Sequence, residues 1–369
     1  MKISSAKTIV VKIGSSTLVD ENLVLRKKWL QNFVKNISDL TSDGKKIVIV
    51  SSGAVALGRK LFGKEKGKLK LEEKQAISAI GQPILIENYQ KLFSKHNLQT
   101  AQILLTISDT ENRRSYLNAR NTFQTLLSKN IIPIVNENDS VATEELKFGD
   151  NDRLSAYVAQ MISADLLIIL SDVDGLYTEN PSKNKNAKHI PLIENIDDKI
   201  EALAGDATSN TGTGGMITKI KAAKIAAESG CATIIASSLK ENSIKNIFEN
   251  KQKYSLFLSQ EKPEKARKTW ILNSLVSKGK VFVDEGAEKA LKAHKSLLAV
   301  GVIKIEGSFE RGEKISVFSA KNIEIAKGIV AYSSQDINLI KGKKSSEIER
   351  ILGFSGREAV IHIDDMVVL

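Results

Sequence analysis

The 369-residue chain has few of the residues that build covalent or metal-bound scaffolds. Its single cysteine, Cys231, excludes an intramolecular disulfide. The four histidines are scattered, at His96, His189, His294 and His362. A structural zinc cluster built from cysteine and histidine is therefore excluded as well.

Long apolar runs are also missing. No uncharged apolar stretch approaches the roughly 20 residues that a helix needs to span a bilayer. The apolar stretch within residues 1–12 is far shorter than the core of a signal peptide. We therefore expect a cytoplasmic protein with no membrane partner.

The composition is that of an ordinary globular protein long enough for two domains, with 42% hydrophobic and 26% charged residues. Lys and Arg number 54 against 43 Asp and Glu, so the formal net charge is +11. This excess favours anionic partners, such as a nucleotide, an acidic metabolite or a nucleic acid.

The first 250 or so residues alternate short apolar runs with amphipathic stretches. The candidate strands are residues 8–13, 46–50, 100–105, 131–136, 166–170 and 233–236. Most are continuous Val/Ile/Leu runs, which is typical of strands buried on both faces of a parallel sheet. Leu30, Phe33, Val34 and Ile37 between them have the spacing of one helix face. The pattern predicts an α/β fold, a three-layer sandwich with a mainly parallel central sheet.

The residue pattern changes after about residue 259, where a charged, proline-containing stretch has the composition of a linker. Beyond it come short strands separated by turn residues, at 280–283, 299–305, 314–318, 324–331 and 359–363. We expect an α/β domain over residues 1–259, a linker over 260–277 and a small, mainly β domain over 278–369.

Parallel sheets bind ligands beyond the carboxyl ends of their strands. The first strand ends in Lys12, followed by the small residues Gly14, Ser15 and Ser16, a composition suited to phosphate oxygens. A glycine-rich loop, residues 211–215, opens a helix with Lys219 in its first turn. A lysine there is electrostatically misplaced unless an anion compensates it. The glycine-rich loop therefore favours phosphate binding over a flexible linker, whereas the first junction taken alone fits a surface lysine before a tight turn equally well.

Two short clusters, residues 136–139 (NEND) and 149–152 (GDND), concentrate carboxylates and carboxamides at neighbouring loops. Turn and helix-cap chemistry explains any one of these side chains taken alone. Their concentration at the ligand-binding edge favours a site for an amino group and a metal-bound phosphate.

The sequence resembles the glutamate 5-kinases of the amino acid kinase family along nearly its whole length. The motifs are VVKIGSS at 10–16, IVSSGA at 49–54, LNARNTF at 117–123, PIVNENDSVAT at 133–143, FGDNDRLSA at 148–156, SDVDGLYT at 171–178 and GTGGMITK at 212–219. The C-terminal part, with VDEGA at 283–287, resembles the PUA domain.

The resemblance implies ATP-dependent phosphorylation of the γ-carboxylate of L-glutamate to γ-glutamyl phosphate, the first step of proline biosynthesis. It implies ATP and Mg²⁺ as the required small molecules, without identifying direct protein ligands for the metal. It also implies proline as a feedback inhibitor and a homo-oligomer, either dimer or tetramer.

The resemblance further assigns roles to residues. Lys12, Lys219 and Asp152 would be catalytic, with Asp152 holding the two lysines in register. The ATP site would comprise Lys12, Ser171, Asp172, Thr213, Gly214, Gly215, Met216, Ile217, Thr218 and Lys219. The glutamate site would comprise Ser52, Asp139 and Asn151. Ser171 stands where many relatives have threonine, and the hydroxyl is kept.

Two alternatives remain open at this level. RNA binding by the C-terminal domain is disfavoured as the main role, because residues 278–369 hold 15 Lys and Arg against 13 Asp and Glu. Another amino acid kinase, acting on aspartate or N-acetylglutamate, is the alternative enzyme. The acidic clusters favour a free amino group over an acetamide.

Overall fold

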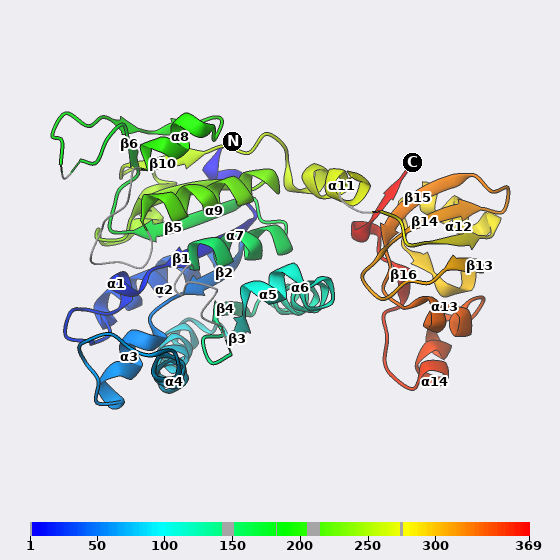
Figure 1. The fold of residues 1–369 in the computed structure, drawn as a ribbon, viewed down its shortest axis with the longest axis horizontal. Coiled ribbons are helices and arrows are strands. Elements are labelled where there is room, and N and C mark those ends of the chain that lie inside the picture. The colour runs from blue at the N-terminus through cyan, green and yellow to red at the C-terminus, as the bar shows by residue number, and fades with distance from the viewer. Residues whose placement is uncertain (1, 142–150, 182, 205–214, 274–275) are drawn as a thin grey trace. The chain divides into compact units, whose positions relative to one another are not determined.

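The computed structural model describes residues 2–141, 151–181, 183–204, 215–273 and 276–369 (Figure 1). The chain forms two compact units, Met1–Pro263 and Glu264–Leu369.

The first unit is built on an eight-stranded sheet in the order β3-β4-β2-β1-β5-β9-β10-β8. Its strands are β1 (Thr8–Ile13), β2 (Lys46–Ser51), β3 (Thr100–Leu105), β4 (Ile132–Glu137), β5 (Leu166–Ser171), β8 (Leu192–Ile193), β9 (Ala232–Ser237) and β10 (Tyr254–Phe257). Neighbours from β3 to β9 are parallel, and β10 runs antiparallel to β9. β6 (Leu176–Tyr177) and β7 (His189–Ile190) form a separate two-stranded pair.

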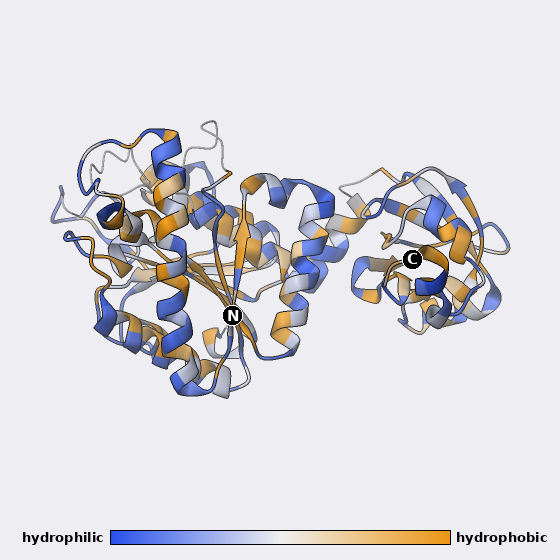
Figure 2. Cartoon of the chain, turned by 90° about the horizontal axis from the view of Figure 1, so that it is seen from below, coloured by the Kyte–Doolittle hydropathy of each residue, from blue (hydrophilic) through white to orange (hydrophobic). Residues whose placement is uncertain are grey.

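Helices cover both faces of this sheet. They are α1 (Ser15–Leu18), α2 (Lys27–Ser42), α3 (Ala54–Leu61), α4 (Leu71–Phe93), α5 (Ile107–Glu111), α6 (Arg113–Ser128), α7 (Asn151–Met161), α8 (Asp198–Leu203), α9 (Met216–Glu228) and α10 (Ser243–Phe248). One apolar core joins the sheet to α2, α4 and α10, and a second joins its other face to α6, α7 and α9. Figure 2 shows largely orange strands inside helices that carry blue on their outer sides.

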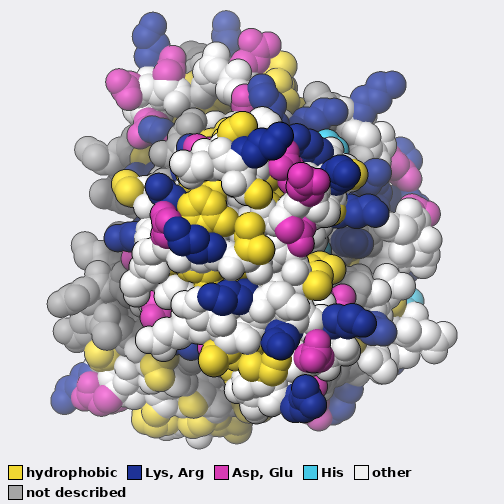
Figure 3. Space-filling view, turned by 90° about the vertical axis from the view of Figure 1, so that its right-hand side faces the viewer, with side chains coloured by type: hydrophobic (Ala, Val, Ile, Leu, Met, Phe, Trp, Pro, Cys, Tyr) yellow, Lys and Arg dark blue, Asp and Glu magenta, His cyan; other side chains and the backbone are white. Residues whose placement is uncertain are grey.

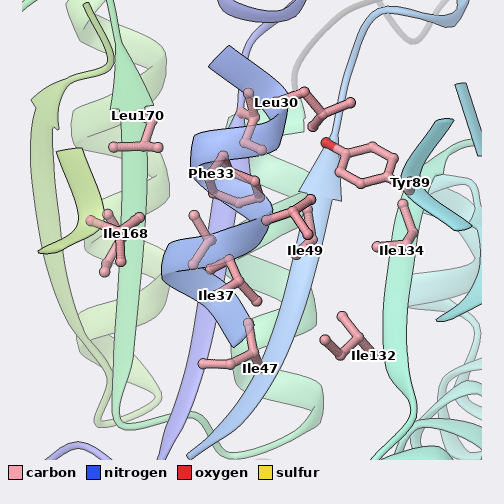
Figure 4. Packing of buried hydrophobic residues seen from close by; sticks show 14 of the residues in the cluster. Leu30, Phe33, Ile37, Ile47, Ile49, Tyr89, Ile132, Ile134, Ile168 and Leu170 are labelled. Atoms are coloured by element: carbon pink, nitrogen blue, oxygen red, sulfur yellow. The ribbon is translucent and has the colours of Figure 1, made fainter. Parts of the chain in front are cut away.

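The apolar pattern of each strand explains this layering. Alternate residues of β1 serve the two cores: Ile9, Val11 and Ile13 lie in the first, and Val10 lies in the second. In the first core, the apolar face of α2 packs on the central strands (Figure 4). The predicted three-layer α/β sandwich with a mainly parallel sheet is confirmed, and each of the six predicted strands is present to within one residue at either end. β8 and β10 were not predicted.

Helices α3 and α4 touch through two glycines. A Cβ added at Gly58 would lie 2.0 Å from the Ile77 carbonyl oxygen, and one added at Gly81 would lie 1.8 Å from the Ala54 carbonyl oxygen. Only glycine permits this approach, so the two helix backbones are in direct contact. Because only two residues separate the end of β2 from the start of α3, the contact fixes α4 against that end of the sheet.

The second unit contains a five-stranded sheet in the order β13-β11-β14-β15-β17 and a two-stranded sheet, β12-β16. The strands are β11 (Gly279–Val283), β12 (Leu297–Leu298), β13 (Val302–Gly307), β14 (Lys314–Ser319), β15 (Glu324–Ile329), β16 (Ala359–Ile361) and β17 (Met366–Val368). Its helices are α11 (Pro263–Asn273), α12 (Glu285–Lys292), α13 (Ser334–Ile340) and α14 (Ile348–Leu352). The prediction of a mainly β C-terminal region is confirmed. The predicted strand 299–305 begins later, because Ala299–Gly301 forms a 3-10 turn.

Helix α11 occupies most of the segment that we predicted as a linker. It lacks an apolar period and is held by polar contacts: Arg267 pairs with Asp365, and the Leu272 carbonyl accepts a hydrogen bond from Lys314. Among the described residues, no helix is both long and apolar enough to cross a membrane.

The helix crossing gives a stability prediction. Alanine normally favours a helix over glycine by about 1 kcal/mol. Gly81→Ala should nevertheless lower stability by about 1–3 kcal/mol, because the added carbon must push α3 and α4 apart. Urea unfolding followed by circular dichroism measures the loss.

Gly286→Ala on α12 is the matched control. There the nearest atom to the added carbon is Oδ1 of Asp284 at 3.3 Å, so a shift of a few tenths of an ångström is enough to relieve the contact. We expect this variant to unfold within about 0.5 kcal/mol of the wild type. An unchanged midpoint for Gly81→Ala would contradict the described contact.

Candidate active site

The polar residues of interest gather where the central strands end. Lys12 lies one residue before the end of β1, in register with Val50 of β2 and Ile169 of β5. Helices α7 and α9 pack against each other and begin close by, which brings Asp152 and Lys219 to the same place.

Asp152 contacts both lysines. Its Oδ1 lies 2.6 Å from Nζ of Lys12, and its Oδ2 lies 3.2 Å from Nζ of Lys219 and accepts a 2.8 Å hydrogen bond from the Thr218 hydroxyl. The exposed fractions are 7% for Lys12, 2% for Asp152 and 5% for Lys219, so all three charges are buried. A buried cluster of two cations and one anion carries an excess positive charge, which favours a further anion.

Electrostatics keep the carboxylate ionised. Burial by itself raises the pKa of Asp152, but the ammonium groups of Lys12 and Lys219 outweigh it and lower the pKa to about 2. Asp152 is therefore a fixed negative charge at neutral pH.

The N-terminus of α9 borders this cluster. Its N-cap is Gly215, which has no side chain to cap the helix, and the first turn holds no acidic residue. The backbone N–H groups of such an end suit phosphate oxygens. Met216, Ile217, Thr218 and Lys219 form the first turn. Thr213 and Gly214 lie outside the described residues.

A second loop follows β5. The hydroxyl of Ser171 donates a 2.8 Å hydrogen bond to Asp172, whose side chain is exposed. The Ser171 carbonyl accepts hydrogen bonds from the backbone N–H and the hydroxyl of Ser238 after β9. These bonds tie the ends of β5 and β9 together.

Amide side chains form a chain on the other side of α7. Nδ2 of Asn151 donates to the Ser52 hydroxyl at 2.7 Å and to Oδ1 of Asn136 at 3.0 Å. Nδ2 of Asn136 donates in turn to Oε1 of Gln82 on α4 at 2.9 Å. Asn151 is 4% exposed, and its Oδ1 has no hydrogen-bond partner among the described residues. A buried acceptor left in this state fits a donor on a ligand.

The side chain of Asp139 is hydrogen-bonded to a residue of α4. It accepts a 2.7 Å hydrogen bond from the Ser78 hydroxyl. Burial raises the pKa of Asp139, while Ser78 and the ammonium of Lys74 act in the opposite direction. Burial lowers the pKa of Lys74, and Asp139 and Glu137 oppose that change.

The structure thus brings Lys12, Asp152 and Lys219 into one cluster, and Ser52 and Asn151 into another. The sequence analysis did not single out Ser78 or Gln82. The one signal available was the presence of polar residues, four apart, in an otherwise apolar part of a helix. Asn136 was noted only as a member of the NEND cluster.

The described residues contain no group of three or more His, Cys, Asp or Glu side chains that could hold a metal ion. Asp152 is already engaged by two ammonium groups. The side chains that the structure describes therefore do not form a metal-binding cage.

Comparison with known proteins decides the family. The model of the amino acid kinase family matches residues 7–237, and that of the PUA domain matches residues 279–352. The chain belongs to the amino acid kinase family.

Relatives within the amino acid kinase family share almost the full length. Glutamate 5-kinase of Agrobacterium fabrum is 49% identical, over 99% of this chain and 94% of its own. Glutamate 5-kinase of Brucella abortus (strain S19) is 48% identical, over 100% of this chain and 97% of its own. The solved carbamate kinase from Giardia lamblia bound to AMP-PNP has a TM-score of 0.50 at 15% identity, covering 69% of this chain and 99% of its own, and shows a shared fold.

The buried carboxylate gives a test by substitution and pH. Asp152→Asn leaves two buried ammonium groups without their anion, so it should lower stability at pH 7 by about 3 kcal/mol or more. Because the folded pKa lies below the unfolded one, the contribution of the carboxylate is complete above about pH 4 and is lost as the pH falls toward 2. The difference in the free energy of unfolding between wild type and variant should therefore shrink as the pH falls from about 4 toward 2.

Urea unfolding at a series of pH values measures this gap. Asp39→Asn, at an exposed position of α2, is the matched control and should stay within about 0.5 kcal/mol of the wild type at pH 7. Equal stability of wild type and Asp152→Asn at pH 7 would refute the electrostatic account.

Proposed function

We propose that the chain transfers the γ-phosphoryl group of ATP to the γ-carboxylate of L-glutamate, giving γ-glutamyl phosphate, as in the first step of proline biosynthesis. The observation that carries this proposal is the convergence of two buried ammonium groups on Asp152 beside the start of α9, whose N-cap is a glycine. The full-length similarity to glutamate 5-kinases supports the choice of substrate.

The chemistry needs no strong general base. At neutral pH the γ-carboxylate of glutamate is ionised and is itself the nucleophile. Phosphoryl transfer requires two anions held in line and compensation of the charge on the transferring oxygens. Lys12 and Lys219 supply cations, and each well-placed donor contributes on the order of 3 kcal/mol of transition-state stabilisation.

The nucleotide would lie along the ends of β5 and β9. Ser171, Asp172 and the stretch Gly215–Lys219 supply hydroxyl, carboxylate and backbone N–H groups there. Thr213 and Gly214, which precede Gly215 in the sequence, are proposed to bind the nucleotide as well.

The acceptor would lie on the amide side of α7. Oδ1 of Asn151 is an acceptor suited to the α-ammonium of glutamate, and the carboxylate of Asp139, held by Ser78, would add negative charge for the same ammonium. The Ser52 hydroxyl borders Asn151. An acetamide in place of the ammonium would leave these acceptors unpaired, which disfavours N-acetylglutamate.

Mg²⁺ is proposed to enter with the nucleotide. Mg²⁺ in such sites is commonly bound by substrate phosphates with one or two carboxylates, and it supplies further charge neutralisation. The described side chains fit this arrangement better than a cage built by the protein alone.

Proline and oligomeric state complete the proposal. Proline shares an α-carboxylate and an amino nitrogen with glutamate, so it could compete for Asn151 and Asp139 as a feedback inhibitor. We place this activity in the cytoplasm and propose a homo-oligomer, either dimer or tetramer.

RNA binding is the weaker alternative. On the side of the molecule shown in Figure 3, Lys and Arg side chains are interspersed with Asp, Glu and apolar groups. Residues 278–369 carry nearly balanced charge, 15 basic against 13 acidic residues. An RNA surface concentrates basic charge.

A coupled ADP-release assay tests the proposed reaction. The wild-type protein should use L-glutamate with a kcat/KM at least about tenfold above that for aspartate, which is one methylene shorter, and above that for N-acetylglutamate. Reactions without an acceptor measure background ATP hydrolysis. A preference for aspartate or N-acetylglutamate would overturn the substrate assignment.

A further inference from the structure

We propose that helix α4 positions the acceptor subsite, with Gln82 setting the orientation of the Asn136 and Asn151 amides and Ser78 holding the carboxylate of Asp139. Both are positioning residues that act through other side chains. The inference rests on the proposed function and deepens it.

The Gln82 argument concerns amide orientation. A carboxamide has a donor end and an acceptor end, and a half-turn exchanges them. Oε1 of Gln82 accepts from Nδ2 of Asn136, which leaves Oδ1 of Asn136 to accept from Nδ2 of Asn151. The donors and acceptors therefore run in one consistent order from Gln82 on α4 to Asn151.

The orientation of Asn136 determines which end of the Asn151 amide is left for the substrate. Because Nδ2 of Asn151 is used on Asn136 and Ser52, its Oδ1 is the end left for a ligand. If Asn136 turned over, Asn151 would have to follow to keep its hydrogen bond. Asn151 would then present an N–H donor to an ammonium, which is itself a donor. Gln82 thus favours the orientation that accepts an α-amino group.

The backbone supports the Asn136 orientation as well. Oδ1 of Asn136 also accepts the backbone N–H of Glu137 at 2.9 Å. Gln82 accepts from Nδ2 of Asn136 and this N–H donates to its Oδ1, so both bonds favour the same orientation of the Asn136 amide. Substitution of Gln82 should weaken the preference of Asn136 for this orientation, while the protein still folds.

Ser78 acts one helical turn earlier. Serine within a helix often bonds the carbonyl of its own preceding turn. Here the Ser78 hydroxyl, in a residue only 3% exposed, donates to Oδ2 of Asp139 at 2.7 Å. A partly buried carboxylate such as that of Asp139 is kept in place and ionised by such donors.

Helix α4 is in close backbone contact with α3 near these two residues. Gly81 lies between Ser78 and Gln82 along α4 and touches the Ala54 carbonyl of α3. The two polar side chains are therefore presented from a fixed backbone next to the Ser52 loop, as a precise positioning role requires.

Paired substitutions at Gln82 test this role in the full-length chain. Gln82→Met keeps the size but removes the acceptor, so the KM for glutamate should rise about tenfold while the KM for ATP changes less than twofold. Gln82→Glu keeps an acceptor for Asn136 and should restore the glutamate KM to within about threefold of wild type. Gln90→Met, at an exposed position of the same helix, is the matched control and should leave both values unchanged.

Ser78→Ala tests the second contact in the same assay. We expect about a tenfold rise in the glutamate KM, again with the ATP KM within twofold of wild type. The unchanged ATP KM shows that each variant is folded.

The possible results separate the two proposals. If the wild type prefers another acceptor, the proposed function fails, and the variants are then measured with that acceptor. An unchanged acceptor KM in Gln82→Met overturns the orientation role, and an equal rise in Gln82→Met and Gln82→Glu overturns it in favour of a packing role. An unchanged acceptor KM in Ser78→Ala overturns the role of Ser78.

Discussion

One buried carboxylate sets the arrangement of the candidate active site. Asp152 binds the ammonium groups of Lys12 and Lys219, which come from β1 and α9 and are 207 residues apart in the chain. Without this anion, two like charges would be buried together at a high energetic cost. With it, the cluster keeps an excess positive charge that a phosphate can neutralise.

The layers of the fold bring these charges together. Parallel strands place Lys12 in the centre of the sheet edge, and the packing of α7 on α9 places Asp152 and Lys219 beside it. The contact of α3 with α4 places Gln82 against Asn136 near the end of β4 and Ser78 against Asp139 in the loop that follows. The start of α7 takes part in both groups of contacts, through Asn151 with Ser52 and Asn136 and through Asp152 with the two lysines.

The strands of the central sheet could be predicted because they are continuous apolar runs. Strands β8 and β10 could not be predicted in this way, because they are only two and four residues long. In addition, β10 pairs antiparallel with β9, unlike the parallel strands before it. Helix α11 lacks an apolar period, and its position depends on partners such as Asp365, which are distant in the sequence.

The polar site could be predicted only in part. Motif resemblance pointed to Lys12, Asp152, Lys219, Ser52 and Asn151, and the structure shows how these groups meet. The contacts of Ser78 and Gln82 depend on which face of α4 meets the sheet edge. That face is fixed by the crossing of Gly58 and Gly81, a tertiary contact that no local pattern reports.

The central claim is that two ammonium groups neutralise a phosphate during its transfer. Steady-state kinetics of Lys219→Ala test it most directly, with Lys221→Ala on the exposed side of α9 as the control. The account predicts a fall in kcat of at least about 100-fold for Lys219→Ala, with the KM for glutamate within about threefold of wild type. A kcat equal to that of the wild type would contradict it.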